Sequence, residues 1–210
     1  RGLVWLWHGD TALADDAARP QLPWFPALPD HDRRAWDLTT EWPLPQLMVM
    51  EGMLDLHHVP FAHRRWLGGV GPLLDPYEVT VTNDGIRTQG TLRRPDQRPE
   101  QGFSIGVDAQ LPGLVHLRFG PRLQGLVAVT PIDRDHTWIF ARYFVDVPVL
   151  GKLLAALGLL FEFALVQPED LRMLSSSSPR EPDVHAHKLV RADLGIARWH
   201  QLFARRSRST

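Results

Sequence analysis

Six consecutive segments of this sequence alternate apolar and polar side chains with a period of two, and they constrain the fold more than any other feature. Such alternation is typical of strands with one buried and one exposed face. The residues Asn83-Asp84-Gly85 separate the first two segments and predict a tight hairpin. The segments, between residues 77 and 147, are YEVTVTN, GIRTQGTLRR, GFSIGVDAQ, LVHLRFG, LQGLVAVTPI and HTWIFARYFVDV.

The periodicity becomes helical after Pro148 and continues to about Leu174, with a break expected at Pro168. Antiparallel strands followed by a long helix are typical of α+β domains. We therefore expect a curved antiparallel sheet gripping the long C-terminal helix, the helix-grip arrangement of START and Bet v 1-like domains. Such a fold would leave a pocket between the sheet and the helix.

The rest of the chain gives weaker signals. Lys152 and Glu162 interrupt the apolar run 147–166, which favours a buried amphipathic helix over a membrane span. The serine-rich stretch that follows predicts a linker, and its His185 and His187 are interpreted as surface residues. The other predicted elements are a short strand at 2–7, a long surface loop at 10–36, a helix at 45–58 ending near His58, and a last helix at 188–206.

Composition limits the possible partners and chemistry. The chain has 210 residues, and we treat residues 1–210 as a single domain. A net charge of -1 gives no electrostatic basis for binding nucleic acid. The absence of cysteine excludes disulfides and thiolate-bound clusters within these residues. The sequence opens on Arg1 without a signal peptide, so we expect a piece of a longer, cytoplasmic protein.

The segment EGMLDLHHVPFAH, residues 51–63, is the strongest candidate for a metal site. On a helix, Asp55 and His58 lie on one face because they are three residues apart. His63, five residues further, would point about 140° away on an unbroken helix. Pro60 should end or bend the helix and push Val59 out of the helical region. This proline would let both imidazoles reach one metal.

Two neutral imidazoles favour a third, anionic ligand from another part of the chain. The segment LVQPEDLRML offers both Glu169 and Asp170, and spacing does not choose between them. Asp55 is better placed to accept a ring N–H of His58 and fix its tautomer. His57 points elsewhere and is interpreted as a neighbour of the site.

These motifs resemble those of the catalytic domain of Rieske-type non-haem iron ring-hydroxylating oxygenases and oxidative demethylases. Asp55, His58 and His63 match the D-x-x-H-x-x-x-x-H motif, and Asp170 matches the late acid that completes the iron site. Gly52 stands where the family often has asparagine. The first and last segments of the chain are also similar to the family's, so the resemblance spans the whole sequence.

The resemblance implies an Fe(II) centre held by His58, His63 and Asp170, with Asp55 carrying electrons towards it. It further implies activation of O2 to hydroxylate or oxidatively demethylate a small apolar substrate. Electrons would come from NAD(P)H through a reductase or ferredoxin and a [2Fe-2S] Rieske cluster. That cluster needs two cysteines, so we expect it in an N-terminal domain outside these residues. The full-length protein would be a homotrimer.

A second hypothesis is a non-catalytic module that binds a small molecule on the helix-grip scaffold. A C-x-H and C-x-x-H pair encoded before Arg1 would favour the oxygenase. Substrate-binding residues are unknown at this level, and aromatic rings, tetrapyrroles and steroids all stay open.

Overall fold

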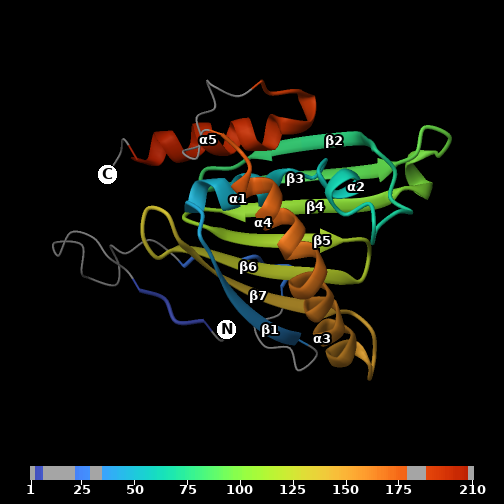
Figure 1. The fold of residues 1–210 in the computed structure, drawn as a ribbon, viewed down its shortest axis with the longest axis horizontal. Helices are drawn as coiled ribbons and strands as arrows, with labels where there is room; N and C mark the ends of the chain where they lie inside the picture. The colour runs from blue at the N-terminus through green and yellow to red at the C-terminus, as the bar shows by residue number, and fades with distance from the viewer. Residues whose placement is uncertain (1–2, 7–21, 29–34, 179–187, 208–210) are drawn as a thin grey trace.

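The computed structural model describes residues 3–6, 22–28, 35–178 and 188–207. Its centre is a seven-stranded antiparallel sheet in the order β1-β7-β6-β5-β4-β3-β2 (Figure 1). The strands are β1 (Ala35–Trp42), β2 (Leu73–Val81), β3 (Gly85–Arg93), β4 (Phe103–Gln110), β5 (Leu114–Phe119), β6 (Leu123–Pro131) and β7 (Thr137–Val145). The helices are α1 (Gln46–Leu54), α2 (Val59–Ala62), α3 (Gly151–Phe161), α4 (Gln167–Ser175) and α5 (Leu194–Ser207), with short 3₁₀ turns η2 (Pro99–Gln101) and η4 (Arg191–Asp193) and a π-helical segment η3 (Glu162–Val166).

The six predicted strands are confirmed as β2 to β7. They form an uninterrupted meander in which each strand pairs with the next along the chain. The predicted hairpin at Asn83-Asp84-Gly85 joins β2 to β3. Sequence-adjacent strands need only short turns, so local alternation and turn residues were enough to define this part of the fold.

The N-terminal predictions were partly wrong. Residues 3–6, inside the predicted strand at 2–7, are not in a strand. The predicted loop at 10–36 overlaps the start of β1, which pairs with β7 at the edge of the sheet. Within that loop, Phe25 and Leu28 are buried against the sheet with Leu114, Leu126 and Phe144. Residues 2, 7, 10–21 and 29–34 of the predicted strand and loop lie outside the described part, as do His185 and His187.

The helices cover one face of the sheet (Figure 1). Segments α3, η3 and α4 form one helical run, Gly151–Ser175, that crosses this inner face. Inward-facing residues of β7, including Ile139, Ala141 and Tyr143, join the core beneath it. The last helix, α5, packs on β2 and β3 and buries Trp199 completely. The α+β helix-grip fold is therefore confirmed.

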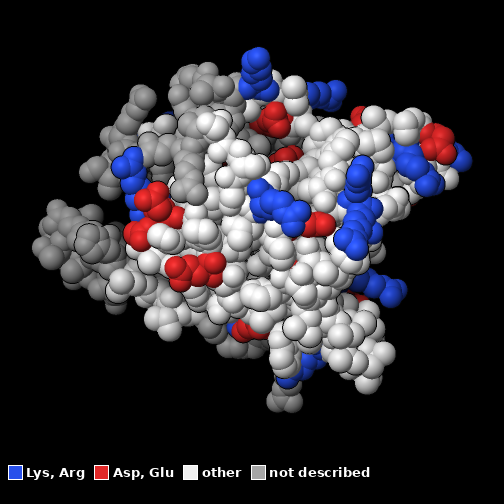
Figure 2. All heavy atoms as spheres, viewed as in Figure 1, with Lys and Arg blue, Asp and Glu red and all other residues white. Residues whose placement is uncertain are grey.

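The long helix is less buried than expected. By length and composition alone, Gly151–Ser175 could cross a membrane, and 22% of its most apolar window is buried. Ala155 and Leu159 face the core, whereas Leu153 and Leu157 are exposed. The surface over α3 shows few charges in Figure 2. The helix covers the core as predicted, but the description as a buried helix was correct for only one of its faces.

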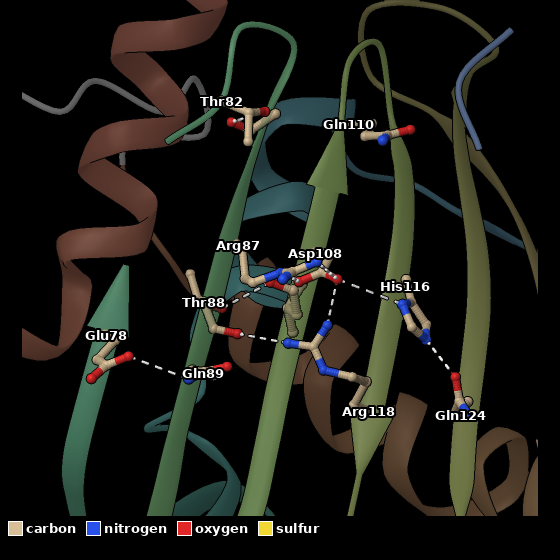
Figure 3. A network of polar contacts seen from close by, with 12 residues as sticks. Glu78, Thr82, Arg87, Thr88, Gln89, Asp108, Gln110, His116, Arg118 and Gln124 are labelled. Carbon is tan, nitrogen blue, oxygen red and sulfur yellow. Dashed lines mark hydrogen bonds and ion pairs between the residues drawn. The ribbon is translucent and has the colours of Figure 1, made fainter. Parts of the chain in front are cut away.

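The opposite face of the sheet carries a polar network (Figure 3). Asp108 accepts hydrogen bonds from Arg87, at 3.0 Å, and from Arg118. His116 lies beside this carboxylate and contacts Gln124 through its Nε2 atom at 2.8 Å. These contacts link β3, β4, β5 and β6 across the sheet.

Candidate metal centre

The chain between α1 and α2 differs from the predicted helix. Helix α1 ends at Leu54, and Asp55 is its extended C-terminal cap, with ψ of 94°. Val59 begins α2 and Pro60 lies in its first turn. A proline is tolerated there because the first amides of a helix have no intrahelical partner. The predictions that one helix continues to His58 and that Val59 leaves the helical region were therefore wrong.

The short helix α2 brings the two histidines together. His58 is its N-terminal cap and His63 its C-terminal cap. Their Nε2 atoms are 3.3 Å apart, and their rings meet edge to face at 81°. His57 points away and contacts the carbonyl oxygen of Pro72 at 2.7 Å. The convergence of His58 and His63, and the exclusion of His57, agree with the sequence analysis.

Helix α4 supplies the acid opposite the imidazoles. Asp170 Oδ1 lies 3.0 Å from His63 Nε2 and 3.4 Å from His58 Nε2. Ligand atoms of these three residues all lie within 4.8 Å of one another. Glu169 turns to the other side and contacts Nδ1 of His63 at 2.9 Å. Of the two candidate acids, Asp170 is therefore the one that faces both Nε2 atoms.

The hydrogen-bond partners define which ring nitrogens carry protons. His58 Nδ1 lies 2.5 Å from the carbonyl oxygen of Asp55, which can only accept. His63 Nδ1 faces the Glu169 carboxylate, which also accepts. In the neutral rings both protons therefore sit on Nδ1, and both Nε2 lone pairs point towards Asp170.

Three electron-pair donors thus converge without a proton between them. Asp170 Oδ1 is buried and has no hydrogen-bond partner among the described residues, although His63 Nε2 is within 3.0 Å. The distance is short, but the angles are not those of a hydrogen bond. Unpaired buried polar atoms are rare in proteins, and a cation placed between these donors would satisfy all three. The residues therefore fit a metal ion.

The electrostatics of the cluster also favour positive charge. Burial lowers the pKa of His58, but the nearby Asp170 carboxylate outweighs this effect, so the pKa of His58 is raised. Burial also lowers the pKa of His63, but Asp170 and Glu169 together outweigh it and raise this pKa to about 9. Burial raises the pKa of Asp170, yet the two histidines bring it below its ordinary value. Protons or a metal cation can supply the charge that this site stabilises.

The carboxylate of Asp55 has a different position from the one expected. Its Oδ1 atom accepts hydrogen bonds from the backbone amides of His57 and His58, at 2.9 and 3.1 Å. The ring of His58 is held by the Asp55 carbonyl, while the carboxylate Oδ2 is 3.9 Å from Nδ1. Asp55 thus orients His58 through its backbone and fixes the turn through its side chain.

A pocket of about 220 Å³ opens beside the cluster, between the inner face of the sheet and helices α1, α3 and α4. Its walls combine aromatic and aliphatic side chains from these elements with His58, His63 and Asp170. The main apolar lining residues are Trp42, Met53, Phe103, Ile105, Leu117, Phe119, Leu123, Phe161 and Met173. An apolar pocket with a few convergent polar groups is the usual form of a small-molecule site.

Sequence reasoning missed two features of this site. Glu169 was considered only as an alternative ligand, whereas it holds the ring of His63. Glu162 was interpreted only as an interruption of an apolar run, whereas it lines the pocket together with Tyr143. An acid inside an apolar helix was the available signal, because buried acids need a partner.

Comparison with solved structures places the fold among Rieske monooxygenases. Dicamba monooxygenase bound to dicamba matches with a TM-score of 0.65 at 16% identity, over 93% of this chain and 64% of that chain. The NdmA QL mutant of Pseudomonas putida CBB5 with caffeine matches with a TM-score of 0.62 at 17% identity, over 86% of this chain and 52% of that one. The quaternary ammonium Rieske monooxygenase CntA matches with a TM-score of 0.60 at 16% identity, over 82% and 50%. This chain spans about half the length of NdmA and CntA.

Among curated proteins, none matches the chain. The model of one family, described as the vanillate O-demethylase oxygenase C-terminal domain, matches residues 44–208. That range contains both histidines, both candidate acids and every pocket-lining residue except Trp42. The chain therefore belongs to the family of vanillate O-demethylase oxygenase C-terminal domains, the catalytic domains of Rieske oxygenases.

Proposed function

We propose that this chain is the catalytic domain of a mononuclear iron oxygenase that hydroxylates or oxidatively demethylates an apolar, cyclic substrate. The observation that carries the proposal is the convergence of two Nε2 lone pairs and a partnerless carboxylate oxygen at the wall of an apolar pocket. Two histidines and one carboxylate on one face are the ligand set typical of Fe(II) enzymes that activate O2.

In this proposal His58, His63 and Asp170 hold the iron. A bound ferrous ion supplies open coordination positions at which O2 can be activated. The Asp55 carbonyl and the Glu169 carboxylate hold the two rings so that both Nε2 atoms face the metal. The apolar walls exclude water and leave the substrate next to the ligand cluster.

The electrons come from outside this domain. A Rieske [2Fe-2S] cluster needs cysteine ligands, and residues 1–210 contain none. The cluster would therefore belong to a further domain, supplied with electrons from NAD(P)H by a reductase or ferredoxin. The trimer and the path through Asp55 are part of the same proposal. Its support is the family and the solved relatives, which this chain covers only in part.

Metal analysis tests this function directly. Protein reconstituted with Fe(II) without oxygen should hold close to one iron per chain, and His58→Ala and His63→Ala should lose it. His136→Ala is the matched control because His136 lies on an exposed turn with Asp133, away from the pocket. Equal iron content in all four proteins would exclude the metal centre and favour the non-catalytic binding module.

A further inference from the structure

The pocket has an unequal distribution of charge. Outside the metal cluster and Asp55, three lining residues carry oxygen atoms in their side chains: Tyr143, Glu162 and Gln167. Among the residues that the structure describes, no lysine or arginine lines the pocket. The pocket therefore contains an additional acid without an additional cation.

Glu162 is placed by an irregular turn of the long helix. It begins the π-helical segment η3, in which the amide of Gln167 donates to the carbonyl of Glu162, five residues earlier. Pro168 follows at once and has no amide to donate to the carbonyl of Ala164. The wide turn before Pro168 accommodates this missing hydrogen bond. Such π-helical turns occur frequently at functional sites.

Tyr143 is fixed against Glu162 from the sheet side. It projects from β7 into the inner layer and is only 3% exposed. A side chain at Gly125 would place its Cβ atom 2.8 Å from Cε1 of the tyrosine ring, so glycine makes room for this ring. The Tyr143 hydroxyl lies close enough to the Glu162 carboxylate for each group to affect the pKa of the other. Glu162 thus has a neutral neighbour in Tyr143, and no lysine or arginine accompanies it among the lining residues that the structure describes.

The surroundings of Glu162 raise the pKa of its carboxyl group. Burial raises the pKa of Glu162, and the charge of Asp170 adds to this effect. The nearby His63 and Tyr143 oppose this rise in part, and the resulting pKa is about 7. A carboxylate in such a place gains from a positive ligand group, whereas a second carboxylate would face it without compensation.

We propose that Glu162, beside Tyr143 in the pocket wall, selects substrates that carry a protonated amine on an apolar body and rejects carboxylates. This inference rests on the proposed function, because it treats the pocket as the substrate site. The amine would form a charge-assisted hydrogen bond with Glu162. The apolar body would lie against the aromatic and aliphatic walls. Specificity would come both from this attraction and from repulsion of anionic competitors.

Three probes of the same shape test the proposal: 2-naphthylmethylamine, 2-naphthalenemethanol and 2-naphthoate. Their affinities are measured by calorimetry without oxygen, at neutral pH, for iron-loaded and for metal-free protein. The wild type should bind the amine at least about tenfold more tightly than the carboxylate, since like charges facing each other in an apolar site cost more than one tenfold step. Glu162→Gln should abolish the preference, and Tyr143→Phe should reduce it.

Glu100→Gln is the matched control, because Glu100 is exposed on η2 and does not line the pocket. It should keep the wild-type preference, and thermal unfolding of each variant shows that the fold is intact. Equal or tighter binding of the carboxylate by the wild type, with or without iron, overturns the proposal. So does a preference that survives in Glu162→Gln, or failure of the wild type to bind the amine. Iron content is measured separately, so loss of the metal centre and loss of amine selectivity are distinguished.

Discussion

Replacing Glu169 by glutamine should weaken iron binding without abolishing it. The Glu169 carboxylate accepts the Nδ1 proton of His63 at 2.9 Å and is 24% exposed. Removal of such a partner behind a metal-bound histidine typically reduces affinity by about 10- to 100-fold, equal to about 1.4 to 2.8 kcal/mol. We expect the lower end, because the glutamine oxygen can still accept the same proton. Replacement of Asp170 by asparagine should cost more, since it removes the anionic ligand itself.

The assay is a competitive Fe(II) titration of the wild type and both variants in the absence of oxygen. Glu100→Gln again serves as the control for loss of one distant negative charge. The expected order of affinity is wild type, then Glu169→Gln, then Asp170→Asn. The reverse order of the two variants would make Glu169 the ligand and would refute the assignment from geometry. Unchanged affinity in Glu169→Gln would show that the ring of His63 needs no such support.

Three further substitutions test other parts of the molecule. In the full-length enzyme, Asp55→Asn should retain iron but slow reduction of the metal centre, and normal single-turnover kinetics would show that the carboxylate only fixes the turn. Asp108→Asn should lower the free energy of unfolding by about 2 kcal/mol at neutral pH, because it weakens charged hydrogen bonds. Burial raises the pKa of Asp108, but the neighbouring His116 and Arg118 bring it well below the ordinary range. Its stabilisation is therefore complete above about pH 4 and is lost as pH falls, so urea unfolding should show the difference between the two proteins shrinking in acid. Gly125→Ala should destabilise the fold by about 1 to 3 kcal/mol through crowding of the pocket wall, and an unchanged melting temperature would contradict the close packing there.

Local sequence patterns predicted the meander of β2 to β7 but not the edge strand β1. Apolar and polar residues alternate along strands β2 to β7 because one face of the sheet packs on the helices and the other is polar or covered. Strand β1 lies at the sheet edge, and most of its residues are partly or fully exposed. On its inner face only Trp42 is fully buried, and Leu38 and Thr40 are partly buried, so the apolar stripe of this strand is weak. Its partner β7 is about a hundred residues away along the chain, so no turn signal could reveal the pairing.

The structure brings together the three predicted ligand residues, but through a local structure that differs from the predicted one. Spacing along an ideal helix made Pro60 the residue that ends the helix after His58. In the structure α1 has already ended at Leu54, and Pro60 lies in the first turn of a new helix that separates His58 from His63. Both arrangements bring the imidazoles together, so the predicted convergence of His58 and His63 did not depend on the predicted geometry. The family motif compares residues position by position and assumes no regular helix.

The same limitation explains why Glu162 was not recognised. On a regular helix, residues 162 and 170 would lie about 12 Å apart along the axis and about 80° apart around it, a spacing that gives no reason to assign both to one pocket. The π-helical turn before Pro168 changes this relation, and the two acids line the same cavity and influence each other's charge. Rules based on 3.6 residues per turn describe α3 and α4 separately but not the turn that joins them. Pro168 lies in the first turn of α4, two positions before Asp170. Pro60 lies in the first turn of α2, three positions before His63. The site is therefore assembled where the helices are irregular, and an acid or histidine close to an in-helix proline is the signal to examine in related sequences.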